Sequence, residues 1–223
     1  MVVILDSLAW LAAGLLNKRF HGMKRPLSLQ ESLCEPLAMN TPQMGIAELL
    51  IRTASVHDSE ATAAIYAKHV ETGTASFDTV ARTIVETSRH IAAINARGWP
   101  FVVAEINGAV VGYAYATQFR DRPAYASTCE NSIYIDADWL GKGIGSALLG
   151  RLITEAEQCG FRQMIAVIGG GEPASVALHT RNGFLHAGRM QSVGRKFGRW
   201  LDTVYMQLQI GRGNTSPPDS ERR

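Results

Sequence analysis

The chain has 223 residues, of which 46% are hydrophobic, 19% charged and 8% aromatic, a composition that excludes collagen-like, coiled-coil and intrinsically disordered chains. The 22 Lys and Arg residues nearly balance the 20 Asp and Glu residues, so the net charge of +2 gives no argument for binding nucleic acid. Cys34, Cys129 and Cys159 lie far apart with no CxxC spacing. This spacing excludes a disulfide framework and a thiolate zinc site, and it favours a reducing cytoplasm.

Residues 1–45 are predicted to be an extension that precedes the main domain. The apolar run over residues 2–16 contains polar interruptions and is shorter than the roughly 20 residues that a membrane-spanning helix needs, so no stable membrane insertion is expected. The positive charges follow this run, whereas a secretory signal places them before it. The segment is either an amphipathic helix over about residues 3–20 or unstructured, and a translation start at Met39 or Met44 would remove it.

Strands and helices alternate from residue 49 onward. The segment LLIRTA predicts a strand, and Asp58 is the predicted N-cap of the helix SEATAAIYAKHVETG. A second helix is predicted over about residues 79–97, ending at Gly98. The Asn107-Gly108 pair between two apolar runs predicts a β-hairpin.

The second half of the chain continues the alternation. A polar loop, RDRPAYAST, is followed by a strand, ENSIYID, and by a glycine-rich turn with a helix opening at about Gly143. The strand RQMIAVIGG comes next, then a helix with Pro173 in its first turn and Gly183 after its end. Two more strands complete a domain predicted over residues 49–210, and the tail at 211–223 is predicted to be disordered.

The glycine-rich turn, LGKGIGS, has the features of a phosphate-binding device. Gly141, Gly143 and Gly145 carry no Cβ atom that would block a ligand. The backbone N–H groups from Gly141 to Ser146 can converge on an anion at the helix N-terminus. The spacing GxGxG matches neither a P-loop nor a dinucleotide-binding GxGxxG. The simpler alternative is a turn in which the glycines only relieve crowding.

The order of these elements and this turn resemble the GNAT superfamily of acetyl-coenzyme A dependent N-acetyltransferases. Within it, the chain is most similar to the phosphinothricin and methionine sulfone or sulfoximine N-acetyltransferases. The shared stretches are TASFDT, VVGYAYATQFRDRPAY, ENSIYID, GKGIGSALL, VIGGGEPASVALHTRNGF and VGRKFGRWLD. The resemblance implies an α+β fold in three layers, a mixed and mostly antiparallel sheet of about seven strands flanked by helices, and a homodimer.

The resemblance also implies that acetyl-coenzyme A is the co-substrate and that the glycine turn holds its pyrophosphate. The implied cofactor-binding residues are Ile133, Tyr134, Ile135, Leu140, Gly141, Lys142, Gly143, Ile144, Gly145, Ser146 and Glu172. Leu140 departs from the family pattern, which has Gln or Arg there, and Glu172 stands where the family has Asn. We expect these two changes to lower cofactor affinity while the backbone donors remain.

Acetyl transfer to an amine requires a base for the substrate ammonium, donors for a tetrahedral oxyanion, and a proton for the departing thiolate. The resemblance implies Glu130 as the general base, with a pKa raised by burial; the alternative is a surface carboxylate at a strand end. His179 is a candidate acid or base, or else a structural histidine. A backbone N–H near Ile135 is expected to meet the oxyanion.

Substrate recognition is predicted in the segment QFRDRPAY. Arg120 and Arg122 alternate along what is expected to be extended chain, so both guanidinium groups face one anionic or strongly polar head, such as a phosphinate, sulfone or carboxylate. The resemblance implies that Tyr125 closes one wall. Phe77 is a further candidate for the wall. The alternatives are two solvated arginines and a core phenylalanine.

Three functions follow as hypotheses. The paired arginines favour an acetyltransferase acting on a small amine over one acting on protein N-termini. A non-catalytic coenzyme A binding module is a third possibility, suggested by Leu140 and Glu172 but opposed by the presence of Glu130 and His179. No metal is expected, because the six histidines show no ligand spacing with cysteine or carboxylate partners.

Overall fold

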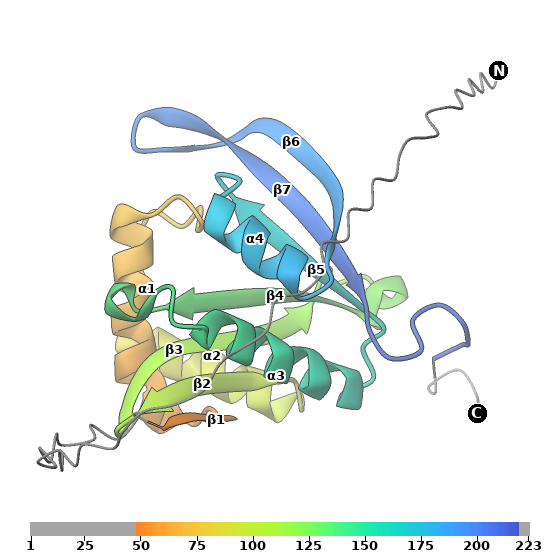
Figure 1. Ribbon diagram of the computed structural model, residues 1–223, viewed down its shortest axis with the longest axis horizontal. Helices are drawn as coiled ribbons and strands as arrows, with labels where there is room; N and C mark the ends of the chain where they lie inside the picture. The colour runs from red at the N-terminus through yellow and green to blue at the C-terminus, as the bar shows by residue number, and fades with distance from the viewer. Residues whose placement is uncertain (1–47, 219–223) are drawn as a thin grey trace, which may run out of the picture. The chain divides into compact units, whose positions relative to one another are not determined.

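Seven strands form one sheet within residues 48–218, the part of the chain that the computed structural model describes (Figure 1). The strands are β1 (Leu49–Thr53), β2 (Phe101–Ile106), β3 (Ala109–Gln118), β4 (Thr128–Ile135), β5 (Gln163–Gly169), β6 (Leu185–Lys196) and β7 (Arg199–Gln209). Their order is β1-β2-β3-β4-β5-β7-β6, and each neighbouring pair is antiparallel except β4 and β5. The predicted mixed, mostly antiparallel sheet is confirmed.

Helices cover both faces of the sheet, which gives the predicted three layers. The described helices are α1 (Ser59–Thr72), α2 (Ile84–Ala96), α3 (Ile144–Gln158) and α4 (Pro173–Arg181), with short 3-10 turns at Val56–Asp58, Pro123–Tyr125 and Ala137–Trp139. Side chains alternate between faces along a strand, so Phe101 and Val103 of β2 pack with α1 and α2, while Val102 and Ala104 pack with α3. The core is therefore two apolar clusters separated by the sheet.

The sheet splays open between β4 and β5. These parallel strands pair only where residues 128–131 lie beside residues 163–166. Beyond this point β4 stays paired with β3 as far as Ile135, and β5 stays paired with β7 as far as Gly169. The facing backbone groups of residues 132–135 therefore have no sheet partner, and a gap opens between the two strands.

Two local predictions are confirmed or refined by the backbone. The predicted hairpin joins β2 to β3, and both turn residues adopt positive φ, 52° at Asn107 and 79° at Gly108. The second helix begins at Ile84 rather than near residue 79, because Thr83 and Glu86 form a reciprocal capping box that fixes its start. The chain before it is a loop, which carries several pocket residues.

Asp58 is the N-cap residue of α1, as predicted, but its side chain makes no capping hydrogen bond to that helix. Its carboxylate accepts from both terminal nitrogens of Arg52, at 2.7 and 2.9 Å, and from the Ser55 backbone N–H at 2.8 Å. The guanidinium of Arg52 holds the pKa of Asp58 below its ordinary value. The acidic group therefore ties β1 to the short turn before α1.

The two ends of the chain differ in how much the structure describes. The expected extension over residues 1–45 lies outside the described residues, as does Cys34. At the other end, the backbone N–H of Gly213 donates to Ile210 and that of Thr215 to Arg212, so the chain forms turns after β7. Among the described helices, none has the length and apolar character needed to span a membrane.

His90 on α2 lies among aromatic rings, and one of its ring nitrogens has no polar partner among the described residues. Its ring lies edge-on to Tyr115, with centroids 4.9 Å apart, and Nε2 is buried with no hydrogen-bond partner among the described residues. Burial, with a smaller contribution from the positive charge of Arg82, lowers the pKa of His90 to about 4. The folded state therefore holds this imidazole neutral under ordinary conditions.

We expect the folded state to lose stability as the pH falls from about 6.5 towards 4. The unfolded chain binds a proton to His90 in this window and the folded chain does not, so stability is fully present above the ordinary histidine pKa. His179, whose pKa burial also lowers, adds to the slope. Thermal melts of His90→Gln across this range should show a flatter dependence than the wild-type protein. An unchanged slope would exclude His90 as its source.

Candidate active site

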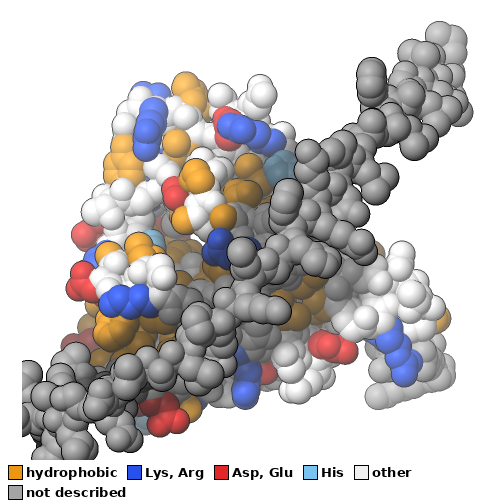
Figure 2. All heavy atoms as spheres, in the orientation of Figure 1, with side chains coloured by type: hydrophobic (Ala, Val, Ile, Leu, Met, Phe, Trp, Pro, Cys, Tyr) orange, Lys and Arg blue, Asp and Glu red, His pale blue; other side chains and the backbone are white. Residues whose placement is uncertain are grey.

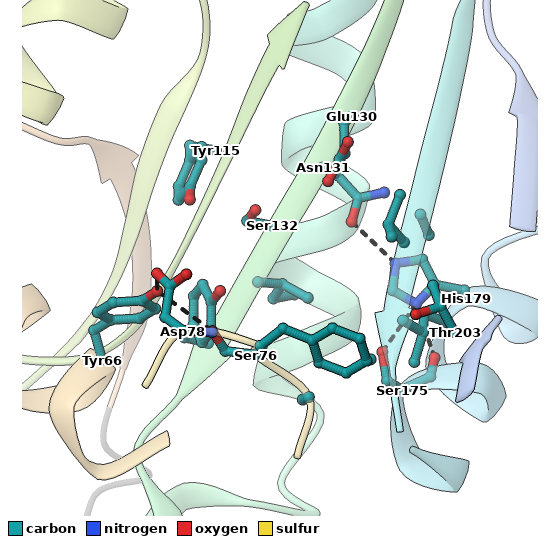
Figure 3. A pocket seen from close by; sticks show the side chains of 18 of the residues that line it. Tyr66, Ser76, Asp78, Tyr115, Glu130, Asn131, Ser132, Ser175, His179 and Thr203 are labelled. Atoms are coloured by element: carbon teal, nitrogen blue, oxygen red, sulfur yellow. Dashed lines mark hydrogen bonds between the residues drawn. The ribbon is translucent and has the colours of Figure 1, made fainter. Parts of the chain in front are cut away.

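A pocket of about 300 Å³ occupies the gap between β4 and β5 (Figure 3). Its walls come mainly from the splayed ends of the two strands, the loop between α1 and α2, and α4, with single residues from α1, β3 and β7. Five of the predicted site residues line it: Phe77, Glu130, Ile133, Tyr134 and His179. The fold thus brings together side chains separated by up to a hundred positions in the chain.

Glu130 lies on β4 at the start of the gap, half-buried in the pocket wall. Burial raises the pKa of its carboxyl group above the ordinary value, and the nearby positive charge of Arg120 acts in the opposite direction. Desolvation destabilises the charged form, so the carboxylate is a stronger base than a surface glutamate. These are the properties of a group that can take a proton from a bound ammonium.

His179 joins α4 to β4 across one wall of the pocket. Nε2 lies 3.0 Å from the side-chain oxygen of Asn131, and Nδ1 lies 2.8 Å from the backbone oxygen of Ser175. The ring is only 2% exposed and packs edge-on against Phe184. Burial lowers the pKa of His179, so the imidazole is neutral near pH 7. A neutral imidazole carries one N–H, so it can donate to only one of these two oxygens, and packing against Phe184 helps to hold the ring in place.

Phe77 is held against the sheet by two glycines. A Cβ atom on Gly169 of β5 would lie 2.9 Å from the Phe77 ring, and one on Gly194 of β6 would overlap that ring. The neighbouring Ser76 carbonyl accepts a 2.8 Å hydrogen bond from Nζ of Lys196, a buried side chain of β6. The β6–β7 hairpin therefore fixes the loop that carries Phe77 into the pocket.

Replacing Gly194 with Ala should displace Phe77 and disturb the pocket. The backbone of Gly194 does not have positive φ, so alanine fits the conformation and only the ring must move. We expect KM for the acceptor substrate to rise several-fold, with acetyl-coenzyme A binding unchanged. The matched control is Gly150→Ala, where a Cβ atom meets nothing within 4 Å. Equal kinetics for the Gly194 variant and wild type would show that Phe77 does not shape the pocket.

The predicted extended segment around the two arginines is not found. β3 ends at Gln118, whose side-chain amide donates to the carbonyls of Arg120 and Arg122, and the chain bends over residues 119–122. The alternation expected of a strand therefore does not apply. The Arg120 guanidinium stacks on the Phe119 ring at 4.6 Å and its charge acts on Glu130. Arg120, Arg122 and Tyr125 are all exposed, and none of the three lines the pocket.

The glycine turn follows β4 and leads into α3. Gly141 and Gly143 have φ of 74° and 83°, and a Cβ atom at either would project into open space. No side chain caps α3 and its first turn has no acidic residue, so its backbone N–H groups are available to an anion. Gly145 differs, because a Cβ there would lie 3.0 Å from Ile135 and 3.3 Å from Leu178. That glycine allows α3 to pack closely on β4 and α4.

Five other predicted cofactor contacts lie around this turn or at the start of α4. The Leu140 side chain is 57% exposed. Lys142 donates to the backbone carbonyl of Asp138 at 2.9 Å and lies over the Trp139 ring at 4.3 Å. Glu172 is the residue before α4 and makes no capping hydrogen bond with its side chain. Ile144 is buried, and Ser146 lies on the first turn of α3.

The pocket also contains polar residues that the sequence analysis did not single out. They include Tyr66, Asp78, Arg82, Tyr115, Asn131 and Ser132. Figure 3 shows Tyr66, Asp78 and Tyr115 on one side of the pocket and Glu130, Asn131 and His179 on the other. These residues come from α1, the loop before α2, β3 and β4, so no single motif in the sequence links them. Within the described chain, no group of three or more His, Cys, Asp or Glu side chains is arranged to hold a metal ion.

The splayed sheet, the half-buried carboxylate and the glycine turn fit the expected fold class, that of the acyl-coenzyme A N-acyltransferases. Residues 51–205 match the acetyltransferase (GNAT) domain family. The protein belongs to this family of acetyltransferases.

Named relatives agree with this assignment. The chain is 43% identical over 197 residues to the phosphinothricin N-acetyltransferase of Alcaligenes faecalis, covering 86% of this chain and all of the relative. It is 43% identical over 129 residues to the L-methionine sulfoximine/L-methionine sulfone acetyltransferase of Salmonella typhimurium, covering 56% of this chain and 75% of the relative. The crystal structure of a phosphinothricin acetyltransferase from Sinorhizobium meliloti, in complex with acetyl-coenzyme A, is similar with a TM-score of 0.75 and 43% identity, covering 76% and 92% of the two chains.

Proposed function

We propose that this protein transfers the acetyl group of acetyl-coenzyme A to the α-amine of a small amino-acid-like substrate with a polar or anionic head, of the phosphinothricin, methionine sulfone or methionine sulfoximine type. The observation that carries the proposal is Glu130, a half-buried carboxylate with a raised pKa that lines a pocket in the gap of the splayed sheet. The named activities of the relatives support the same substrate class.

The residues have the following roles in this proposal. Acetyl-coenzyme A supplies the acetyl thioester. Glu130 takes the proton from the substrate ammonium, directly or through water, which frees the nitrogen lone pair to form the new C–N bond. The unpaired backbone N–H groups at the end of β4, around Ile135, stabilise the oxyanion before the C–S bond breaks. His179 fixes the β4–α4 wall or supplies a proton to the departing thiolate.

The cofactor is held by backbone groups in this proposal. The N–H groups from Gly141 to Ser146 bind the pyrophosphate, and Lys142 adds a positive charge nearby. Ile133, Tyr134 and Ile135 flank the pantetheine arm along the open edge of β4. Oriented amides bind an anion whatever side chains surround them, so Leu140 and Glu172 reduce affinity without removing the site.

The acceptor substrate is placed by groups near Glu130. Arg120, whose charge reaches Glu130, binds the α-carboxylate next to the reacting amine. Phe77 forms a wall of the pocket, while Arg122 and Tyr125 approach the substrate only through movement of the loop over residues 119–127.

We also propose a cytoplasmic homodimer. The described cysteines, Cys129 and Cys159, are free thiols, which suits a reducing compartment. Leu201, Val204 and Met206 of β7 are buried in the core, so these three side chains are not available for an interface. Exposed apolar side chains of the β6–β7 hairpin, including Trp200, are the proposed contact between copies. Sedimentation of the purified protein tests this assignment.

Release of free thiol from acetyl-coenzyme A tests the main proposal. The full chain is assayed with phosphinothricin, with methionine sulfone and with a peptide that has a free N-terminus. We expect thiol release with one or both amino acid analogues and little with the peptide. Activity with the peptide alone would assign the protein to N-terminal acetylation. Binding of acetyl-coenzyme A without thiol release from any acceptor would assign it to a non-catalytic role.

A further inference from the structure

Arg82 is a half-buried cation in the pocket without a carboxylate partner. It lies on the loop between α1 and α2, and its guanidinium stacks on the Tyr66 ring at 4.7 Å. Tyr115, which also lines the pocket, interacts with it electrostatically. No carboxylate of the described residues forms an ion pair with it. A buried charge without a counter-charge is costly unless a ligand supplies one.

The aromatic groups around Arg82 do not neutralise it. Burial raises the pKa of Tyr66 to about 12 and raises the pKa values of Tyr113 and Tyr134 well above the ordinary value, so these phenols are uncharged at neutral pH. They provide a flat, apolar surface on which a guanidinium packs without losing its charge. Stacking uses the face of the guanidinium, so the N–H groups of Arg82 that do not face Tyr115 stay available for a ligand.

Asp78 is the carboxylate on this side of the pocket, and its charge is offset locally. Its carboxylate accepts a hydrogen bond from the Tyr66 hydroxyl (Figure 3). This bond helps to orient the ring on which the Arg82 guanidinium stacks. The ammonium of Lys196, held by the Ser76 carbonyl, acts electrostatically on Asp78 from the β6 side. Counting Asp78, Lys196 and Arg82 together leaves one positive charge, that of Arg82.

We propose that Arg82 binds the charged head of the acceptor substrate and makes the pocket favour an anionic head, such as a phosphinate or carboxylate, over a neutral one such as a sulfone. This inference rests on the proposed function and refines it. Arg82 lies with Tyr66 and Tyr115, which Figure 3 places across the pocket from Glu130. An amino acid lying between them puts its amine at Glu130, its α-carboxylate near Arg120, and its head at Arg82.

The test compares two acceptors that differ in the charge of the head. Steady-state kinetics with phosphinothricin and with methionine sulfone are measured for wild type, Arg82→Gln and Arg82→Lys. We expect Arg82→Gln to lower kcat/KM for phosphinothricin by roughly 10- to 100-fold, as for loss of a charge-assisted hydrogen bond, and for methionine sulfone by less than about threefold. Arg82→Lys should recover part of the loss. KM for acetyl-coenzyme A should not change.

Arg89→Gln is the matched control, because it removes an exposed arginine from the following helix α2. Thermal melts establish that each variant is folded. Equal losses with both acceptors, or no loss with either, would overturn the role of Arg82. If wild type acetylates neither acceptor, the proposed function fails, and calorimetry with phosphinothricin then tests Arg82 separately. Binding that weakens in Arg82→Gln supports the inference, and absence of binding to wild type contradicts it.

Discussion

Replacing Glu130 with Gln should lower kcat by roughly 10²- to 10⁴-fold, the range observed for a positioned general base. The amide has nearly the same shape but cannot take a proton from the substrate ammonium. Because the pocket of Glu130 is separate from the glycine turn, we expect the affinity for acetyl-coenzyme A to change by less than about twofold. Stopped-time assays of thiol release, together with calorimetry of cofactor binding, measure both quantities.

The pH dependence gives a second measurement on the same variant. Burial raises the pKa of Glu130, so the rate of the wild-type enzyme should fall on the acid side as this carboxylate becomes protonated. The Gln variant should lack that limb. Glu71→Gln, an exposed change near the end of α1, is the control and should match wild type. Wild-type turnover in the Glu130 variant would assign this carboxylate to structure.

The elements that local sequence dictates were predictable, and the fold follows from them. The Asn107-Gly108 pair sets its own turn through positive φ at both residues, and Gly143 marks the start of α3 for the same conformational reason. By contrast, the start of α2 depended on a capping box at Thr83 and Glu86 that competes with weaker signals upstream. The turn set by Asn107 and Gly108 was therefore predicted at its correct position. The predicted start of α2 lay about five residues too early, because the capping box was not recognised.

The candidate site was predicted only where a motif carries the information. Glu130 and His179 come from stretches that resemble a known family, and both line the pocket. The prediction that the Arg122 side chain faces the pocket assumed the alternation of an extended strand. The chain bends after β3, so this alternation does not apply. Arg82 carried no signal, because its importance arises from stacking on Tyr66, a residue sixteen positions away on another element. Contacts of this kind exist only once the chain is folded.

Replacing Gly143 with Ala should weaken acetyl-coenzyme A binding by roughly 10- to 100-fold. The φ of 83° disfavours any residue with a Cβ atom by about 1 kcal/mol, so the turn must shift its N–H groups or accept strain. The added methyl group also projects into the open space in front of α3, where a phosphate would lie. Calorimetry with acetyl-coenzyme A measures the loss, and kcat at saturating cofactor should change much less.

Gly150→Ala separates this effect from a general change in α3. Gly150 lies within the same helix, does not have positive φ, and has open space where the Cβ would be. Alanine there should raise the free energy of unfolding by about 0.5–1 kcal/mol, because it restricts the unfolded chain and favours the helix, with cofactor affinity unchanged. Wild-type affinity in the Gly143 variant would contradict the assignment of this turn to the pyrophosphate. Loss of affinity in both variants would point instead to a distortion of the whole helix.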